Sequence, residues 1–273
     1  MQDLLGNPAV QGGVAPFVVA LAAACALFAV RLAGLAIAAA LGTAVYLIGG
    51  FAFPPASAQQ KILLISLAVP LLGIIVDLAL KPTRVAGPVL GLIFGVLVIW
   101  VGWNVLKQKE IAAMLAAGAA VALLAGWVIA SCFALRDDPV RAGAAALALG
   151  LGVGISAVLS ASGSYGQYGA SVGAGAGAFL LVQMVLGRTI RAGATFTLSA
   201  GVACGLLAAG ACLGAQLPWY AAAVLALVPL ATLLPLPRGG IWLQAIVASI
   251  YGGLVAAAAC LLSWSVVQQR LGI

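Results

Sequence analysis

The sequence has very little charge for its length, and it contains no histidine. Of its 273 residues, twelve are Lys or Arg and five are Asp or Glu, whereas 65% are hydrophobic. A soluble domain carries about 25% charged and about 45–50% apolar residues. The chain therefore lacks the polar surface that a soluble fold of this length requires. Its charges fall between long apolar runs, with the one exception of Asp77, as expected for a chain embedded in a bilayer.

The missing residue types also disfavour several classes of function. Without histidine, and with four of the five acids in predicted loops or tails, no acid/base pair, catalytic triad or His-rich metal set is expected at depth. We expect no enzyme, no catalytic residue, no metal and no cofactor. The net charge of +7 does not indicate a nucleic-acid partner, because no basic stripe with interleaved aromatics accompanies it. Membrane lipids are the expected partners.

The apolar runs predict an all-α integral membrane protein with about ten transmembrane helices in a single membrane domain, 1–273. Each run is close to the roughly 20 residues that span a hydrocarbon core. Nine spans is the alternative count, because Pro229 and Pro235 interrupt the ninth run. The predicted segments are 14–30, 32–53, 62–80, 85–106, 111–135, 142–161, 165–187, 193–216, 219–236 and 241–264.

The charged stretch 136–141 divides these segments into two sets of five, 14–135 and 142–264. Five spans per half would give the halves opposite orientations, as in transporters built from inverted repeats. The glycine series do not support this symmetry, because they fall in the fourth and seventh segments, whereas an inverted repeat pairs the fourth with the ninth. The sequence leaves the two-half arrangement open.

The distribution of Lys and Arg predicts the orientation. The tails and even-numbered loops hold Lys61, Lys107, Lys109 and Arg270, whereas the odd-numbered loops hold twice as many: Arg31, Lys81, Arg84, Arg136, Arg141, Arg188, Arg191 and Arg238. Basic residues collect in cytoplasmic loops. We therefore expect a multi-pass protein of the bacterial inner (plasma) membrane with both termini on the outer side.

Asp77 is the only acid inside a predicted span, which makes it a candidate for binding an ion, a proton or a substrate. It lies about one turn from the predicted cytoplasmic end and four residues before Lys81. Asp and Lys at this spacing share a helix face. A structural ion pair at the membrane surface is therefore the interpretation that the sequence favours.

The most polar uncharged stretch, 160–169, lies in the predicted outer loop between the sixth and seventh segments. Tyr165, Gln167 and Tyr168 could donate hydrogen bonds to an uncharged ligand or a lipid headgroup there. The alternative is an interfacial hairpin anchored by its aromatic residues, which is the commoner role of such a stretch.

Glycine is placed in two series with a spacing of four residues, which lines one face of each helix: Gly87, Gly91 and Gly95, and Gly169, Gly173 and Gly177. Helices in a membrane approach closely where small residues face each other. Both series are therefore predicted to be helix-packing faces. The five cysteines show no CxxC spacing and are predicted to be small packing residues.

These features favour a permease-like carrier for a small uncharged or lipophilic solute. The alternative is a non-catalytic accessory or scaffold subunit of a larger membrane complex, which would need no polar pathway. Either function is compatible with a homodimer or with other membrane subunits as partners.

Overall fold

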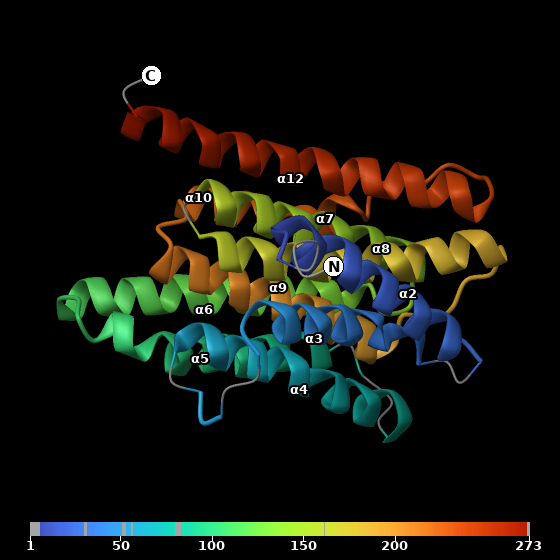
Figure 1. Ribbon diagram of the computed structural model, residues 1–273, viewed down its shortest axis with the longest axis horizontal. Helices are drawn as coiled ribbons and strands as arrows, with labels where there is room; N and C mark the ends of the chain where they lie inside the picture. The colour runs from blue at the N-terminus through green and yellow to red at the C-terminus, as the bar shows by residue number, and fades with distance from the viewer. Residues whose placement is uncertain are drawn as a thin grey trace.

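All the regular structure in the described part of the chain is helical (Figure 1). The computed structural model describes residues 6–29, 32–50, 53–55, 57–79, 83, 85–160 and 162–271, and in the last helix the side chains up to 268. The elements are η1 (Val10–Val14, a π-helix), α2 (Ala15–Ala26), η2 (Ala33–Leu35, a 3₁₀ helix), α3 (Ala36–Ile48), α4 (Ala58–Ala79), α5 (Ala86–Leu106), α6 (Ile111–Ala134), α7 (Pro139–Leu159), α8 (Gly163–Leu186), α9 (Gly193–Gly214), α10 (Trp219–Leu225), α11 (Val228–Ala231) and α12 (Ile241–Leu271).

Seven of these helices are long and apolar enough to cross a membrane: α4, α5, α6, α7, α8, α9 and α12. The three other predicted segments are helical but shorter, over Val10–Ala26, Ala33–Ile48 and Trp219–Ala231. At 1.5 Å per residue the longest of them reaches about 25 Å, less than the roughly 30 Å of a hydrocarbon core. The prediction of an all-helical, membrane-compatible chain is confirmed, whereas the count of ten spans stays a prediction.

The ninth predicted segment, which two prolines interrupt, is the shortest of the ten in the structure. It is broken into α10 and α11 at Ala226 and Leu227, and Pro229 stands in the first turn of α11. The indole Nε1 of Trp127 in α6 donates a hydrogen bond to the carbonyl of Ala226 (3.0 Å). A side chain from another helix thus satisfies a backbone carbonyl at the break, as backbone polar groups require inside a membrane.

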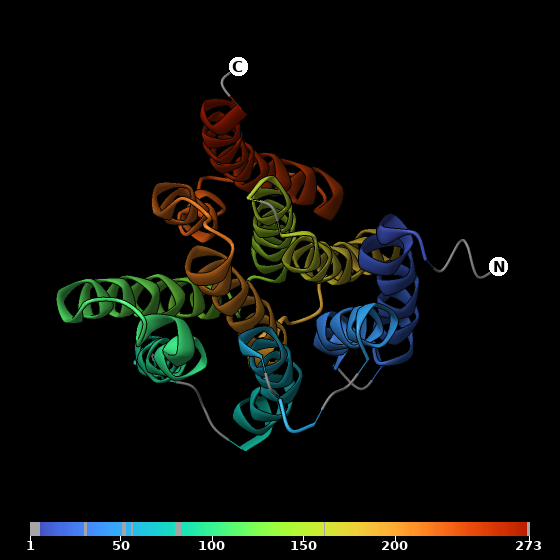
Figure 2. The ribbon, with the colours of Figure 1, turned by 60° about the vertical axis from the view of Figure 1, so that its left-hand side comes forward.

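Helix α9 forms the centre of the bundle, and α6 and α12 lie at its edges (Figure 2). In the most apolar 18-residue stretch of each helix, 89% of the residues are buried in α9, but only 22% in α6 and 28% in α12. The uncovered faces of the edge helices carry large apolar side chains such as Leu115, Leu123 and Leu261. Lipid is the solvent that suits such faces.

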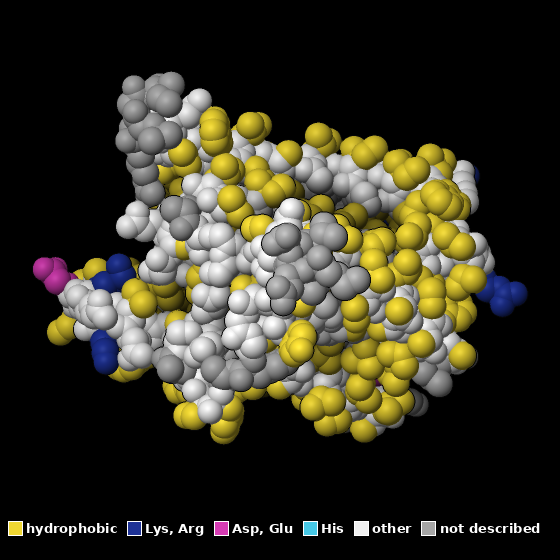
Figure 3. Space-filling model, in the orientation of Figure 1, with side chains coloured by type: hydrophobic (Ala, Val, Ile, Leu, Met, Phe, Trp, Pro, Cys, Tyr) yellow, Lys and Arg dark blue, Asp and Glu magenta, His cyan; other side chains and the backbone are white. Residues whose placement is uncertain are grey.

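The surface view agrees with a position in a membrane. Lys, Arg, Asp and Glu side chains lie at the two ends of the face in Figure 3, and the side chains drawn in colour between these ends are apolar or uncharged. Trp103, Trp219 and Trp264 are exposed near one end of the bundle and Trp242 near the other. Exposed tryptophans at both ends are typical of helices that cross the two membrane interfaces.

Two of the most extensive helix pairs, α5 with α6 and α7 with α8, approach closely at glycine. A Cβ on Gly91 would lie 2.5 Å from the carbonyl oxygen of Gly126, and one on Gly95 would lie 2.6 Å from that of Ala122. A Cβ on Gly169 would lie 2.6 Å from the Cα of Gly154. Gly173 also faces α7, next to Leu151.

One end of each predicted glycine series is less tightly packed. A Cβ on Gly87 would lie 3.2 Å from the ring of Phe133, and a Cβ on Gly177 would lie 3.6 Å from Leu147. The nearest atoms at these two positions belong to side chains, which can move, whereas at Gly91, Gly95 and Gly169 they belong to the backbone. The closest approach is therefore concentrated at the last two glycines of the α5 series and at the first glycine of the α8 series.

Candidate functional site

The polar groups at one end of the bundle join three loops and the start of α9. The N–H of Gly193 donates to the carbonyl of Arg136 (3.1 Å), and Arg191 forms an ion pair with Asp137 (2.8 Å). The guanidinium of Arg141 donates to the carbonyls of Leu233 and Leu234, at 3.3 and 3.4 Å.

We call this end of the bundle the Asp77 end, because Asp77 also binds the start of α9 here. The loops after α6, α8 and α11 thus lie together, as the sorting of basic residues by loop requires. Arg31, Lys81 and Arg84 lie outside the described residues, as does the side chain of Arg270.

Asp77 caps the first turn of α9 from a neighbouring helix. One carboxylate oxygen accepts the N–H of Ala194 (2.7 Å), and the other accepts the N–H (2.8 Å) and the hydroxyl (2.7 Å) of Thr195. The first N–H groups of a helix have no partner within it and carry a partial positive charge. Ala192, which occupies the N-cap position, has no side-chain acceptor to offer. The Asp77 carboxylate replaces that missing cap.

Two glycines make this contact possible. Gly73 lies one turn before Asp77 on α4, and a Cβ there would lie 2.5 Å from the Cα of Thr195. Gly193 has φ +66°, in the left-handed region, and a Cβ on it would lie 2.6 Å from a carboxylate oxygen of Asp77. The α4 backbone therefore rests directly on the start of α9, where both carboxylate oxygens of Asp77 have partners.

The three other predicted site residues lie near the start of α8, which we call the Tyr165 end. Because α8 begins at Gly163, Tyr165, Gln167 and Tyr168 belong to its first two turns and not to a loop. The placement of these three residues in a loop over 160–169 is therefore wrong, whereas the predicted seventh segment, 165–187, already contained them and began two residues late. Alanine and glycine around the tyrosines allow the helix to start early and to pack against α7.

Polar, uncharged groups surround these residues. The hydroxyl of Ser164 donates to the side-chain oxygen of Gln59 (3.3 Å), at the start of α4. Gly12 of η1 packs against the backbone of Gln167, where a Cβ on the glycine would lie 3.0 Å from the Cα. Tyr165 is 9% exposed and Tyr168 is 3% exposed. The tyrosines are therefore interior residues and not aromatic anchors on the surface.

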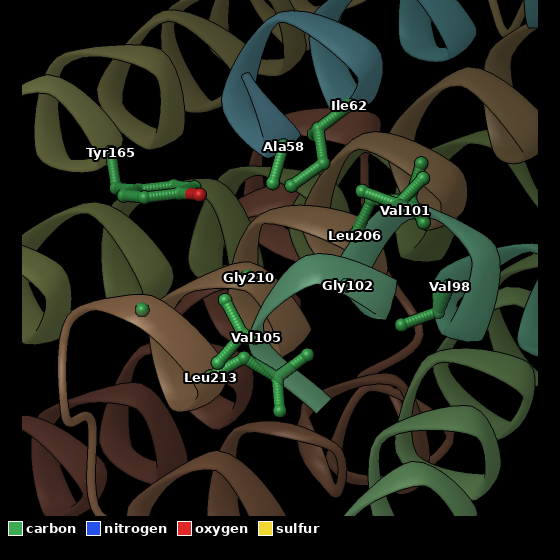
Figure 4. A pocket seen from close by; sticks show the side chains of 11 residues that line it. Ala58, Ile62, Val98, Val101, Gly102, Val105, Tyr165, Leu206, Gly210 and Leu213 are labelled. Carbon is green, nitrogen blue, oxygen red and sulfur yellow. The ribbon is translucent and has the colours of Figure 1, made fainter. Parts of the chain in front are cut away.

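A small cavity lies beside Tyr165, between α4, α5, α8 and α9 (Figure 4). Its volume is about 30 Å³, which is enough for a water molecule. The Tyr165 hydroxyl is the one polar side-chain group on the lining, and it points toward Ala58 in the view. The other lining residues are Ala58, Ile62, Val98, Val101, Gly102, Val105, Leu206, Gly210, Leu213 and Gly214.

Ser66 brings further polar atoms to the interior, one turn along α4 from Ile62 of the cavity lining. Its side chain is 2% exposed, and its hydroxyl has no hydrogen-bond partner among the described residues. Pro70 has no N–H to donate to the Ser66 carbonyl four residues earlier. Polar groups without partners are costly at this depth. The α4 face toward α9 thus offers hydrogen-bonding capacity next to the cavity.

The structure separates the predicted site residues into two groups. The side chains of Tyr165 and Ile62 both lie against Gly210, at one end of α4. Asp77 lies fifteen residues after Ile62 on the same helix. At 1.5 Å per residue this separation is about 22 Å. Asp77 and Tyr165 therefore do not line one common pocket, and an uncharged cavity and an acid-capped helix start are separate features.

Sequence reasoning missed Thr195, Gly73 and Ser66. The spacing of Gly73 and Asp77 by one turn, with a second glycine at 193, was the available signal for the cap. Pro70 was the signal for a free carbonyl at Ser66. The described residues contain no group of three His, Cys, Asp or Glu side chains that could hold a metal ion. Comparison with known proteins found no matching family model, no similar curated protein and no similar solved structure.

Proposed function

We propose that the protein is a permease-like carrier for a small uncharged or lipophilic solute in the bacterial inner membrane. The observation that carries this proposal is the uncharged cavity between α4, α5, α8 and α9, which has the Tyr165 hydroxyl on its lining. A ligand pocket that is mostly apolar, with a few polar groups to orient its ligand, suits an uncharged solute. Ser66, one turn away, adds a hydroxyl that a solute with a hydrogen-bonding group would satisfy.

In this proposal the solute passes between two groups of helices that move relative to each other. The cavity is formed by α4 and α5 from the first half of the chain and by α8 and α9 from the second. A volume of about 30 Å³ is too small for a solute, so the present conformation is the closed one. Opening begins at the Tyr165 end, because the α4–α9 contact is fastened at the other end by Asp77.

Inverted halves would give this motion its symmetry. Helix α3 packs on α8 and α4 packs on α9, and each of these pairs joins segments that an inverted repeat relates to one another. At the edges the pattern differs, because α12 packs chiefly on α7 whereas its counterpart α6 packs on α5 and α9. The proposed two-fold relation therefore concerns the central helices.

Uptake into proteoliposomes tests the proposal. A panel of radiolabelled uncharged solutes is offered to liposomes with and without the protein, and at least one solute is expected to enter faster with it. Gly214→Leu places a side chain next to the cavity at a glycine that has no neighbour within 4 Å of its Cβ position. This variant is expected to slow uptake at least tenfold at unchanged protein content.

Gly253→Leu is the matched control, because Gly253 also has open space around its Cβ position but lies in α12, away from the cavity. It is expected to transport normally. If no solute of the panel enters faster than it enters empty liposomes, the carrier proposal is overturned. Equal loss in both variants would exclude the cavity as the pathway.

The orientation belongs to the same proposal. The Asp77 end carries the basic loops, so we place it in the cytoplasm and both termini outside. A reporter fused to the C-terminus and active only in the cytoplasm is expected to stay inactive. Activity of that reporter would reverse the orientation and leave the carrier proposal to be judged by uptake.

The edge helix α12 favours the alternative function, a scaffold or accessory subunit. It spans Ile241–Leu271, and only 28% of its most apolar 18-residue stretch is buried. A partner subunit would cover this face as well as lipid does. Extraction in a mild detergent followed by size measurement separates the two proposals. A defined assembly with other proteins supports the scaffold, whereas a monomer or homodimer supports the carrier.

A further inference from the structure

A second, larger cavity opens at the Asp77 end, between the end of α2, the end of α4 and the loop from α8 to α9. Its volume is about 600 Å³, and half of its lining is polar. Phe28, Asp77, Arg188, Arg191 and Gly193 are among the residues that line it. Four other cavities among the described residues have almost entirely apolar linings.

Among the described residues that line this cavity, Arg188 carries a positive charge that is not already paired. Arg188 is exposed, follows Gly187 at the end of α8, and forms no hydrogen bond or ion pair within the described part of the chain. Arg191 is already paired with Asp137 at 2.8 Å. Asp77 accepts three hydrogen bonds from the start of α9, which offset its negative charge. An anion at this position would therefore meet one arginine that has no partner among these residues.

An apolar groove leads from this cavity along the surface between α2 and α8. Its volume is about 440 Å³, and Leu21, Cys25, Phe28, Leu181, Val185 and Leu186 are among its lining residues. Phe28 lines both the groove and the polar cavity. Val185 is 68% exposed, so the groove is open toward the surrounding bilayer. A polar, cationic compartment and a long apolar one thus share a wall.

We propose that this composite site binds one phospholipid with an anionic headgroup. The phosphate lies against Arg188, and an acyl chain lies in the groove between α2 and α8. An arginine guanidinium binds phosphate oxygens through two parallel hydrogen bonds, and basic pockets beside membrane helices attract anionic lipids. A free phosphate would leave the adjoining groove unfilled, whereas a phospholipid fills both compartments. The proposal is independent of solute transport.

Lipid retention on the purified protein tests the headgroup contact. Delipidated protein in a mild detergent is mixed with phosphatidylglycerol or with phosphatidylcholine of the same chains, and bound lipid is counted by native mass spectrometry. Arg188→Gln is expected to weaken phosphatidylglycerol binding about fivefold, the effect of one arginine near a membrane surface. Arg238→Gln, an exposed basic residue at the same end that does not line the cavity, is the control and is expected to bind normally.

A second pair of variants tests the groove. Cys25→Phe fills part of it, whereas Val18→Phe enlarges another exposed residue of α2 that does not line it. Both positions face away from the interior, so both variants are expected to fold. Cys25→Phe is expected to lower phosphatidylglycerol binding at least threefold, and Val18→Phe is expected to leave it unchanged.

Each other outcome contradicts the proposal. Equal losses for Arg188→Gln and Arg238→Gln would indicate general attraction to a basic surface. Displacement of the lipid by millimolar inorganic phosphate alone would indicate a phosphate site without a role for the groove. Unchanged binding in both Arg188→Gln and Cys25→Phe would mean that the lipid binds elsewhere.

Discussion

At the Asp77 end, both carboxylate oxygens of Asp77, the one acid inside a helix of the described chain, accept hydrogen bonds in a contact between α4 and α9, whereas at the opposite end the Tyr165 hydroxyl lines a cavity. The glycines differ in the same way. A Cβ on Gly73 would collide with the backbone of Thr195, but Gly214, beside the cavity, has nothing within 4 Å of its Cβ position.

The difference separates two uses of polar groups in a membrane bundle. A charge inside a helix is tolerated at the Asp77 end because the start of another helix supplies its partners. Uncharged polar groups are less costly to leave without a partner, and those of Tyr165 and Ser66 lie beside or near the small cavity. We therefore expect the two ends to differ in stability and in their response to substitution.

Asp77→Ala should have the largest effect. It leaves two N–H groups and a hydroxyl at the start of α9 without their acceptor, in a buried position. Asp77 itself is exposed, but Ala194 and Thr195 are buried, and leaving their donor groups without a charged acceptor is expected to lower the free energy of unfolding by about 3 kcal/mol. Thermal unfolding of the purified protein, followed by tryptophan fluorescence, measures this loss.

Asp138→Ala is the control for that experiment. Asp138 caps α7 and accepts the N–H of Arg141 from its own helix at 3.2 Å. An ordinary cap of this kind is worth about 1 kcal/mol. Equal melting temperatures for the two variants would show that the contact between α4 and α9 contributes no more than a local cap.

Gly73→Ala and Gly214→Ala compare the packing of the two ends directly. Gly73→Ala forces the α4 backbone away from Thr195 and is expected to cost about 2 kcal/mol, as overpacking of a close contact does. Gly214→Ala places a methyl group in open space and is expected to change stability by less than about 0.5 kcal/mol. The melting temperatures of both variants give the answer, and a reversed order would contradict the proposed contrast.

Tyr165→Phe tests whether the hydroxyl at the cavity serves a ligand or the fold. This hydroxyl lies on the cavity lining. Its removal is therefore expected to change the free energy of unfolding by no more than about 1 kcal/mol, the contribution of one ordinary hydrogen bond. Uptake of a transported solute is expected to fall several-fold. A large loss of stability with normal uptake would assign the hydroxyl to the fold.

Asp137→Asn should have the smallest effect. It weakens the ion pair with Arg191 (2.8 Å), whose two side chains are 61% and 70% exposed, and a longer one with Arg136 (3.6 Å), whose side chain is 15% exposed. Exposed ion pairs contribute about 0–1 kcal/mol, so a change below about 0.5 kcal/mol is expected. If the melting temperature instead falls as far as in Asp77→Ala, the ion pairs of Asp137 stabilise the Asp77 end as strongly as the Asp77 cap does.

Particular residues show how far the sequence predicted the fold and the site. The boundaries of α5 and α6 were predicted to within one residue, because Arg84, Lys107, Glu110 and Arg136 flank uniform apolar runs. The start of α8 was predicted two residues late, at 165 instead of Gly163, and 160–169 was also assigned to a loop, because its glycines and hydroxyls resemble a turn when read without neighbours. Packing against α7 gives those residues a helical conformation despite their weak propensity.

Sparse charge and long apolar runs were enough to determine a helical, membrane-compatible chain, because unpaired charge and unpaired backbone groups are both costly in lipid. The distribution of Lys and Arg among the loops also predicted which loops share one side of the bundle. Only the tertiary structure decided that Asp77 caps α9, that Tyr165 faces a cavity about 22 Å away along α4, and that α9 is central. These results depend on which helices approach each other, and in a chain this uniformly apolar the hydrophobic pattern does not distinguish one helix neighbour from another.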